Sequence, residues 1–192
     1  MSLILASSSP RRSELLHNAA IPFIVEPAHV LEQPLLNEKP LEYAQRLARD
    51  KARAVYARHS GSTVLGADTV VVMDEHLLEK PADEHDAARM LGLLSGRDHQ
   101  VITGVSLVAL GFERTEAEIT QVVFSALSED EIESYVGTGE PMDKAGAYAI
   151  QGLASRWVVR IEGCYFNVVG LPVPRVYRML QAAEAVLGEP LL

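Results

Sequence analysis

Two spacings of apolar residues succeed each other along the chain, and they predict strands and helices in turn. Apolar runs at the start of residues 3–12 and over residues 63–73, the second with one carboxylate in its middle, are typical of buried strands. Apolar residues recur at helical spacing through residues 41–57, so we expect an amphipathic helix there. Residues 98–110 and 113–124 read as long strands, the second with one face toward water. The pattern predicts an α/β fold without internal repeats or low-complexity linkers.

Local end signals predict further helices and one hairpin. Asp83 has the features of a helix start, and Ser128 with Glu131 has the spacing of a capping box. Pro172 is expected to open the last helix. Residues 157–169 are expected to form a hairpin of two short strands. The elements therefore alternate along the chain, as in a layered α/β protein.

The helix expected after the first strand carries two arginines in its first turn. Ser9 stands at the N-cap position and Pro10 where a missing N–H costs nothing. Cations normally avoid the positive end of a helix dipole, so Arg11 and Arg12 require a reason to be there. A bound polyphosphate would supply it, since N–H groups, hydroxyls and guanidinium groups converge. The alternative is that both arginines point into water or pair with surface carboxylates.

One carboxylate, Asp68, interrupts the apolar run 63–73. An unpaired carboxylate there would be strongly desolvated, so we expect a cation, a metal or a hydrogen-bonding partner. The alternative is a turn between two shorter strands. Gly66, just before it, leaves room for a ligand or another backbone. Lys51 lies within the apolar stripe of the preceding helix and either extends to water or is aimed into a cleft.

Lys80 and Gln151 each have a binding interpretation and an ordinary structural one. Lys80 fits a phosphate ligand, but the segment alone favours an exposed lysine before a loop proline. The Gln151 amide can pair with both donor and acceptor positions of a nucleobase edge. Alternatively, Gln151 is a strand-edge glutamine bonded to backbone. Gly146 and Gly152 in the same loop permit close backbone approach.

Composition limits the class of protein. The chain has 192 residues, of which 48% are hydrophobic and 22% charged, which suits one domain, with two lobes at most. A net charge of −9 argues against extended binding to nucleic acid. Cys164 cannot form an internal disulfide, and the histidines lack zinc-site spacing. No run has membrane-span length and no basic region precedes the first apolar stretch, so we expect a cytoplasmic protein.

Several motifs together resemble the Maf family of nucleoside triphosphate pyrophosphatases over nearly the whole chain. They are Ala6–Arg12, Gly66–Thr69, Glu79–Pro81, Leu94–Gly96 and Asp143–Gly152. Their shared order is more specific than any one motif. The Tyr-Ala-Ile-Gln-Gly form of the last motif resembles the branch that acts on dTTP and UTP rather than the 7-methyl-GTP branch.

The resemblance implies a fold, a reaction and partners. The implied fold is α/β, elongated and two-lobed like inosine triphosphatases, with a mixed sheet, a central substrate cleft and one catalytic domain over residues 1–192. The implied reaction is hydrolysis of dTTP, UTP and related or modified pyrimidine nucleotides to the monophosphate and pyrophosphate, assisted by a divalent cation, Mg²⁺ or Mn²⁺. The implied role is house-cleaning, the removal of unwanted nucleotides. A homodimer is implied, and no membrane partner. Alternatives are a 7-methyl-GTP pyrophosphatase, or a nucleotide-binding regulator of septum formation whose hydrolysis is incidental.

The resemblance also assigns roles to individual residues. Asp68 matches the proton acceptor, and Asp68 with Glu32 would hold the metal. The residues that match substrate-selecting positions are Arg11, Thr69 and Gln151. The residues that match phosphate-binding positions are Ser7, Arg12, Lys51 and Lys80.

Overall fold

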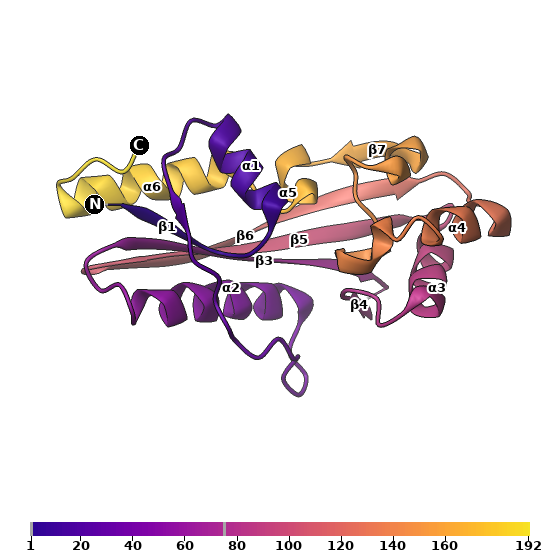
Figure 1. Ribbon diagram of the computed structural model, residues 1–192, viewed down its shortest axis with the longest axis horizontal. Helices are drawn as coiled ribbons and strands as arrows, with labels where there is room; N and C mark the ends of the chain where they lie inside the picture. The colour runs from indigo at the N-terminus through magenta and orange to yellow at the C-terminus, as the bar shows by residue number, and fades with distance from the viewer. Residues whose placement is uncertain (1, 75) are drawn as a thin grey trace. The chain divides into compact units, whose positions relative to one another are not determined.

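A computed structural model describes residues 2–74 and 76–192 and has an α/β fold (Figure 1). Within these residues the strands form one seven-stranded mixed sheet in the order β2-β1-β3-β5-β6-β7, with β4 paired to β3. The expected fold class and mixed sheet are confirmed. The strands are β1 (Leu3–Ala6), β2 (Ile24–Val25), β3 (Thr63–Met73), β4 (His76–Leu78), β5 (Asp98–Ala109), β6 (Phe112–Phe124) and β7 (Val158–Glu162).

Helices connect most of these strands, as the alternating pattern predicts. The α-helices are α1 (Pro10–Asn18), α2 (Pro40–Tyr56), α3 (Glu84–Leu94), α4 (Glu129–Val136), α5 (Tyr165–Val169) and α6 (Val173–Leu187). Short 3₁₀ helices are η1 (Glu140–Asp143), η2 (Ala145–Ala147) and η3 (Leu153–Trp157). Among the described residues, no helix combines the length and the apolar character that crossing a membrane requires.

The chain divides into two compact units, in agreement with the expected two lobes. The first unit holds the chain up to Asp68, Thr103–Glu118 and Gly170–Leu192. The second unit holds Thr69–Ile102 and Ile119–Val169. The first division falls inside β3, directly after Asp68.

In the first unit, α2 lies so close to the sheet that its backbone touches two strands. A Cβ added at Gly66 of β3 would lie 2.1 Å from the carbonyl oxygen of Ala48, and one at Gly104 of β5 would lie 2.2 Å from that of Ala44. These glycines are therefore required by the approach of the helix. The space beside Gly66 holds helix backbone, and Lys51 follows Ala48 by three residues on the same face of α2.

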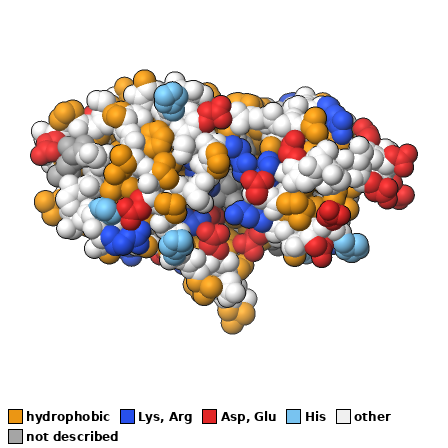
Figure 2. All heavy atoms as spheres, viewed as in Figure 1, with side chains coloured by type: hydrophobic (Ala, Val, Ile, Leu, Met, Phe, Trp, Pro, Cys, Tyr) orange, Lys and Arg blue, Asp and Glu red, His pale blue; other side chains and the backbone are white. Residues whose placement is uncertain are grey.

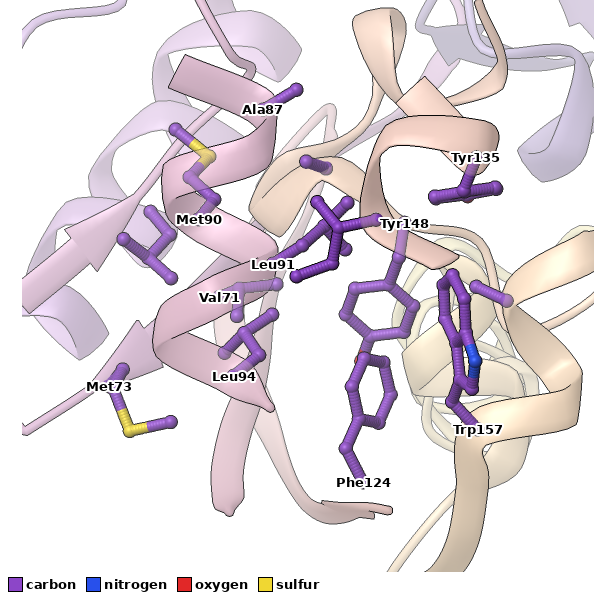
Figure 3. Packing of buried hydrophobic residues seen from close by; sticks show 14 of the residues in the cluster. Val71, Met73, Ala87, Met90, Leu91, Leu94, Phe124, Tyr135, Tyr148 and Trp157 are labelled. Atoms are coloured by element: carbon purple, nitrogen blue, oxygen red, sulfur yellow. The ribbon is translucent and has the colours of Figure 1, made fainter. Parts of the chain in front are cut away.

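In the second unit, aromatic rings and aliphatic side chains of α3, α4, β6 and the 3₁₀ segments form a buried cluster (Figure 3). The rings of Tyr135 and Trp157 meet edge to face at 5.1 Å, and those of Phe124 and Tyr148 at 4.8 Å. Such pairs add to the stabilisation from apolar burial. The cluster anchors the segment from residue 135 to residue 157 against the sheet.

Most of the predicted element ends are confirmed, with one exception. Asp83 caps α3 by accepting from Asp86 N–H at 2.8 Å, and Ser128 opens α4 with a capping box. Ser9 is the N-cap of α1, yet its side chain makes no capping bond. The last helix follows Pro172.

The expected hairpin over residues 157–169 is wrong in its second half. β7 pairs antiparallel with β6, but the residues after it form helix α5. The hydroxyl of Thr120 accepts from the backbone N–H of Cys164 at 3.0 Å and from the Asn167 amide at 3.0 Å. The same amide donates to the carbonyl of Val101 at 2.9 Å. These buried contacts with β5 and β6 favour a helical turn over a strand.

Candidate active site

Asp68 forms a buried ion pair with Lys51 in the first unit. β3 runs unbroken from Thr63 to Met73, so the alternative of a turn at Asp68 is wrong. Asp68 is 7% exposed, and Lys51 Nζ donates to its Oδ1 at 2.7 Å. Lys51 is therefore the cationic, hydrogen-bonding partner that a carboxylate at this buried position was expected to have.

Lys51 also pairs with a second carboxylate. Its Nζ lies 2.6 Å from Oε1 of Glu32, whose side chain is 46% exposed. Lys51 therefore does not extend to water from the apolar stripe of α2. Instead, its ammonium group joins a buried carboxylate of the sheet to an exposed carboxylate of the loop that precedes α2.

Arg12 is held beside these charges by α1. Its Nε donates to the carbonyl oxygen of Gly170 at 2.8 Å and its Nη1 to Oγ of Ser7 at 3.1 Å. The Ser7 hydroxyl also accepts from the backbone N–H of Ser9 at 3.2 Å. For Arg12 the alternative of an arginine that points into water is therefore wrong. Arg11 precedes it on the same turn and is half-buried.

Burial shifts the pKa values of Asp68 and Arg12 in opposite directions, in each case against the charged form. Desolvation raises the pKa of Asp68, and the positive charges of Lys51 and Arg12 only partly oppose it. Desolvation likewise lowers the pKa of Arg12, against the pull of the Asp68 charge. The charge of Arg11 lowers the pKa of Arg12 further. Perturbed groups of this kind gather at functional sites.

The carboxylates of this cluster suit a divalent cation that binds together with phosphate. Among the residues that the structure describes, no group of three or more His, Cys, Asp or Glu could hold a metal ion by itself. Asp68 and Glu32 nevertheless bring two carboxylates to one point, because both contact Lys51 Nζ. Mg²⁺ is commonly held by one or two carboxylates together with substrate phosphates and waters. The donor chemistry of Asp68 and Glu32 therefore fits such an ion, while in this structure the Lys51 ammonium group contacts both carboxylates.

Three of the predicted site residues belong to the second unit. Thr69 follows Asp68 on β3 and is half-buried, while Lys80 is exposed just after β4. Gln151 is exposed on a turn that closes with a hydrogen bond from Gly152 N–H to Ala149 O at 3.0 Å. The strand-edge interpretation of Gln151 is therefore wrong.

The structure adds a residue pair that the sequence did not indicate. Arg46 of α2 binds the Glu38 carboxylate at 2.6 and 2.8 Å through two nitrogens and donates to the carbonyl of Gln33 at 2.9 Å. These bonds tie the segment next to Glu32 onto the helix that carries Lys51. Nothing in the spacing of Glu38 and Arg46 marks the pair, because Glu38 precedes the helix.

Charges of both signs occur together on the surface. Figure 2 shows basic side chains scattered among acidic and hydrophobic ones on the face drawn. This distribution agrees with a net charge of −9. A small anion would therefore be bound by cations grouped locally, such as Arg11, Arg12 and Lys51.

Comparisons with known proteins agree with the motifs. Residues 2–183 match the model of the Maf family, described as Maf-like protein. A dTTP/UTP pyrophosphatase of Koribacter versatilis is 62% identical over 183 residues, which cover 95% of this chain and 95% of that protein. A protein with the same name from Symbiobacterium thermophilum is 55% identical, over 93% of this chain and 92% of its own length. Another from a Geobacillus species is 51% identical, over 92% of this chain and 95% of its own length.

Proposed function

The chain belongs to the Maf family, and from this membership we propose that it hydrolyses dTTP and UTP to the nucleoside monophosphate and pyrophosphate. It is a hydrolase that acts on the anhydride bonds of nucleoside triphosphates. The observation that carries the finer proposal is the buried Asp68–Lys51 pair beside Arg12. It combines a carboxylate of raised pKa with cations suited to a polyphosphate.

Asp68 is the general base in this proposal. Hydrolysis between the α and β phosphates needs a water placed in line with the leaving pyrophosphate. Because burial raises the pKa of Asp68, its carboxylate accepts a proton from that water more readily than an exposed aspartate does. The position of Asp68 on a buried strand limits its movement, so the carboxylate stays oriented during the reaction.

The cations neutralise the triphosphate and hold the leaving group. Lys51 and Arg12 are anchored by the contacts described above, and Arg11 adds charge on the first turn of α1. The Ser7 hydroxyl offers a hydrogen bond to a phosphate oxygen. In the second unit, Lys80 is an exposed cation, and its match to a family motif is the reason for assigning it to phosphate binding. Neutralising the phosphate charge favours attack by the water.

A divalent cation, Mg²⁺ or Mn²⁺, held by Asp68 and Glu32, would supply further neutralisation of the phosphate charge. The contact of Glu32 with Lys51 supports the assignment of Glu32, because Lys51 also contacts Asp68, the general base of this proposal. Arg46 and Glu38 would maintain that arrangement.

Gln151, Thr69 and Arg11 select the substrate in this proposal. The Gln151 amide would accept from the N–H of a thymine or uracil ring and donate to a ring carbonyl. Cytosine presents the reverse pattern at these positions and would leave the amide and the base edge without hydrogen-bond partners, so it would be rejected. The three relatives are each named dTTP/UTP pyrophosphatase, which supports this pyrimidine branch over the 7-methyl-GTP branch.

The test mixes purified protein and Mg²⁺ with dTTP, UTP, CTP and 7-methyl-GTP separately and identifies both products of each reaction. We expect monophosphate and pyrophosphate from dTTP and UTP. Activity on 7-methyl-GTP alone would contradict the role of Gln151. Binding without turnover would favour a regulator of septum formation, and full activity of a folded Asp68→Asn variant would remove Asp68 as the base.

The remaining expectations concern the assembly. A homodimer stays a prediction, and so does any role in restraining cell division. Size-exclusion chromatography with light scattering tests the dimer. Comparing cells that carry the Asp68→Asn protein with cells that carry the unaltered protein tests whether any effect on division depends on catalysis.

A further inference from the structure

The turn that carries Gln151 is held on both sides by side chains of its own unit. Before the turn, the hydroxyl of buried Tyr148 lies 2.8 Å from Nε2 of buried His99. After the turn, the backbone N–H of Leu153 donates to both carboxylate oxygens of Glu140, at 3.1 and 3.3 Å. Gln151 itself is exposed. An exposed side chain therefore stands on a backbone whose two ends are anchored.

Glu140 connects this turn to helix α4. Besides Leu153, its Oε1 accepts from the hydroxyl of Tyr135 at 2.9 Å. Burial and this hydrogen bond raise the pKa of Tyr135, so the phenol stays neutral and donates. The Tyr135 ring packs against Trp157, within the cluster of Figure 3. The carboxylate is thus held in place by an element that is itself well packed.

Gly152 leaves no space between the turn and this carboxylate. A Cβ at Gly152 would lie 1.9 Å from Oε1 of Glu140 and 2.6 Å from its Cδ. The backbone of Gly152 is extended, with φ −95° and ψ −157°, which any residue can adopt. A side chain at position 152 would therefore have to displace the Glu140 carboxylate, whereas the backbone conformation there sets no demand for glycine.

We infer that Glu140 is a positioning residue that sets the base selectivity of Gln151. This inference rests on the proposed function, in which Gln151 reads the pyrimidine edge. The Gln151 amide can pair with a pyrimidine edge only where its backbone places it at hydrogen-bond distance from the base. The position of this turn therefore governs how well the amide distinguishes uracil from cytosine. Glu140 removes backbone freedom on the C-terminal side of Gln151, as His99 and Tyr148 do on the other side.

The experiment measures kcat and KM for UTP and CTP in variants of Glu140. For Glu140→Ala we expect the preference for UTP over CTP to fall by at least about 10-fold, with a smaller change in kcat for UTP than in its KM. Glu140→Gln keeps the side-chain length and one acceptor oxygen, so its preference should stay within about 3-fold of the original. Glu140→Asp withdraws the carboxylate from Leu153 and should behave like Glu140→Ala.

Gly152 supplies an independent variant of the same contact. Gly152→Ala should reduce selectivity as Glu140→Ala does, because its Cβ displaces the carboxylate. Adding Gly152→Ala to Glu140→Ala should change selectivity by less than about 2-fold, since the clashing partner is gone. The fluorescence of Trp157, the single tryptophan of the chain, reports whether the packing around Tyr135 has changed.

Glu131→Ala is the matched control. Glu131 also accepts from a buried aromatic residue, the indole N–H of Trp157 at 3.2 Å, and from a backbone N–H, that of Ser128 at 2.9 Å. It makes neither of the contacts that anchor the turn at Gly152 and Leu153. We expect a lower unfolding temperature with unchanged selectivity. If Glu140→Ala gave that same result, Glu140 would be structural only and the inference would be overturned.

Gln151→Ala separates failure of the inference from failure of the proposed function. If it abolishes selectivity while Glu140→Ala and Gly152→Ala leave it intact, the inference alone is wrong. If Gln151→Ala leaves selectivity unchanged, or the unaltered protein hydrolyses no triphosphate, the proposed function fails and the inference fails with it. Circular dichroism confirms that each variant is folded, and Glu140→Gln and Gly152→Ala keep the test decisive should Glu140→Ala not fold.

Discussion

Acid should destabilise this protein through one buried histidine. Burial lowers the pKa of His99 to about 4, and the negative charge of neighbouring Asp98 raises that pKa by less than burial lowers it. Its Nε2 contacts the Tyr148 hydroxyl, and among the described residues no group forms a hydrogen bond with Nδ1. The folded protein therefore keeps His99 neutral where the unfolded chain, with a pKa near 6.5, binds a proton. Because the unfolded state binds more protons between these values, stability is lost as the pH falls from 6.5 toward 4.

The magnitude follows from the two pKa values. A histidine with a pKa of about 4 in the folded state and about 6.5 in the unfolded state contributes ~3 kcal/mol of pH-dependent stability. The assay is urea unfolding at pH 7, 5.5 and 4.5 of the unaltered protein and of His99→Gln, which stays neutral and can still bond to Tyr148. The variant should be less stable at pH 7 through imperfect packing, yet lose less stability on acidification.

The exposed His85 on α3 provides the control for this prediction. His85→Gln should leave the pH dependence unchanged within ~0.5 kcal/mol, because exposed substitutions rarely exceed that value. The reasoning is refuted if His99→Gln and the unaltered protein lose equal stability between pH 7 and 4.5.

Two further predictions concern the candidate active site. Gly66→Ala should lower the free energy of unfolding by ~3 kcal/mol and reduce dTTP turnover, because its Cβ would displace α2 and with it Lys51. Thermal unfolding measures this loss, with Gly61→Ala as the control because its Cβ would meet nothing within 4 Å. Equal melting temperatures of the two variants would contradict the close packing. In the pH profile of kcat/KM, the loss of activity toward acid should occur above the ordinary pKa range of an aspartate, because burial raises the pKa of Asp68. In Lys51→Met this loss should move to still higher pH, because the charge of Lys51 holds the pKa of Asp68 down. An unchanged profile in Lys51→Met would count against Asp68 as the titrating base.

Local signals predicted most elements of the fold. The apolar run around Asp68 is one unbroken strand, and the capping residues Asp83 and Ser128 start helices as expected. Such signals succeed because periodicity and capping act between residues a few positions apart. They failed for residues 165–169, where buried hydrogen bonds from β5 and β6 favour a helix over the expected strand.

Part of the candidate site could also be predicted. The buried position of Asp68 indicated a cation, a metal or a hydrogen-bonding partner, but the pattern left Lys51 between two interpretations. The packing of α2 against Gly66 resolves it, since it brings the Lys51 ammonium group to 2.7 Å from the carboxylate. The contacts of Glu38 with Arg46 and of Glu140 with Leu153 had no signature in the sequence.

Patterns within the sequence were enough to predict an α/β fold, most of its elements and membership of a family of nucleoside triphosphate hydrolases. These features depend on the side chains of short segments and on motifs that occur in one order. Tertiary structure decided which side chains meet. Lys51 and Asp68 are 17 residues apart, and Arg12 and Gly170 are 158 residues apart, so their contacts depend on how helices pack on the sheet. Packing at this distance is decided by the shape of the whole core, which no local pattern contains.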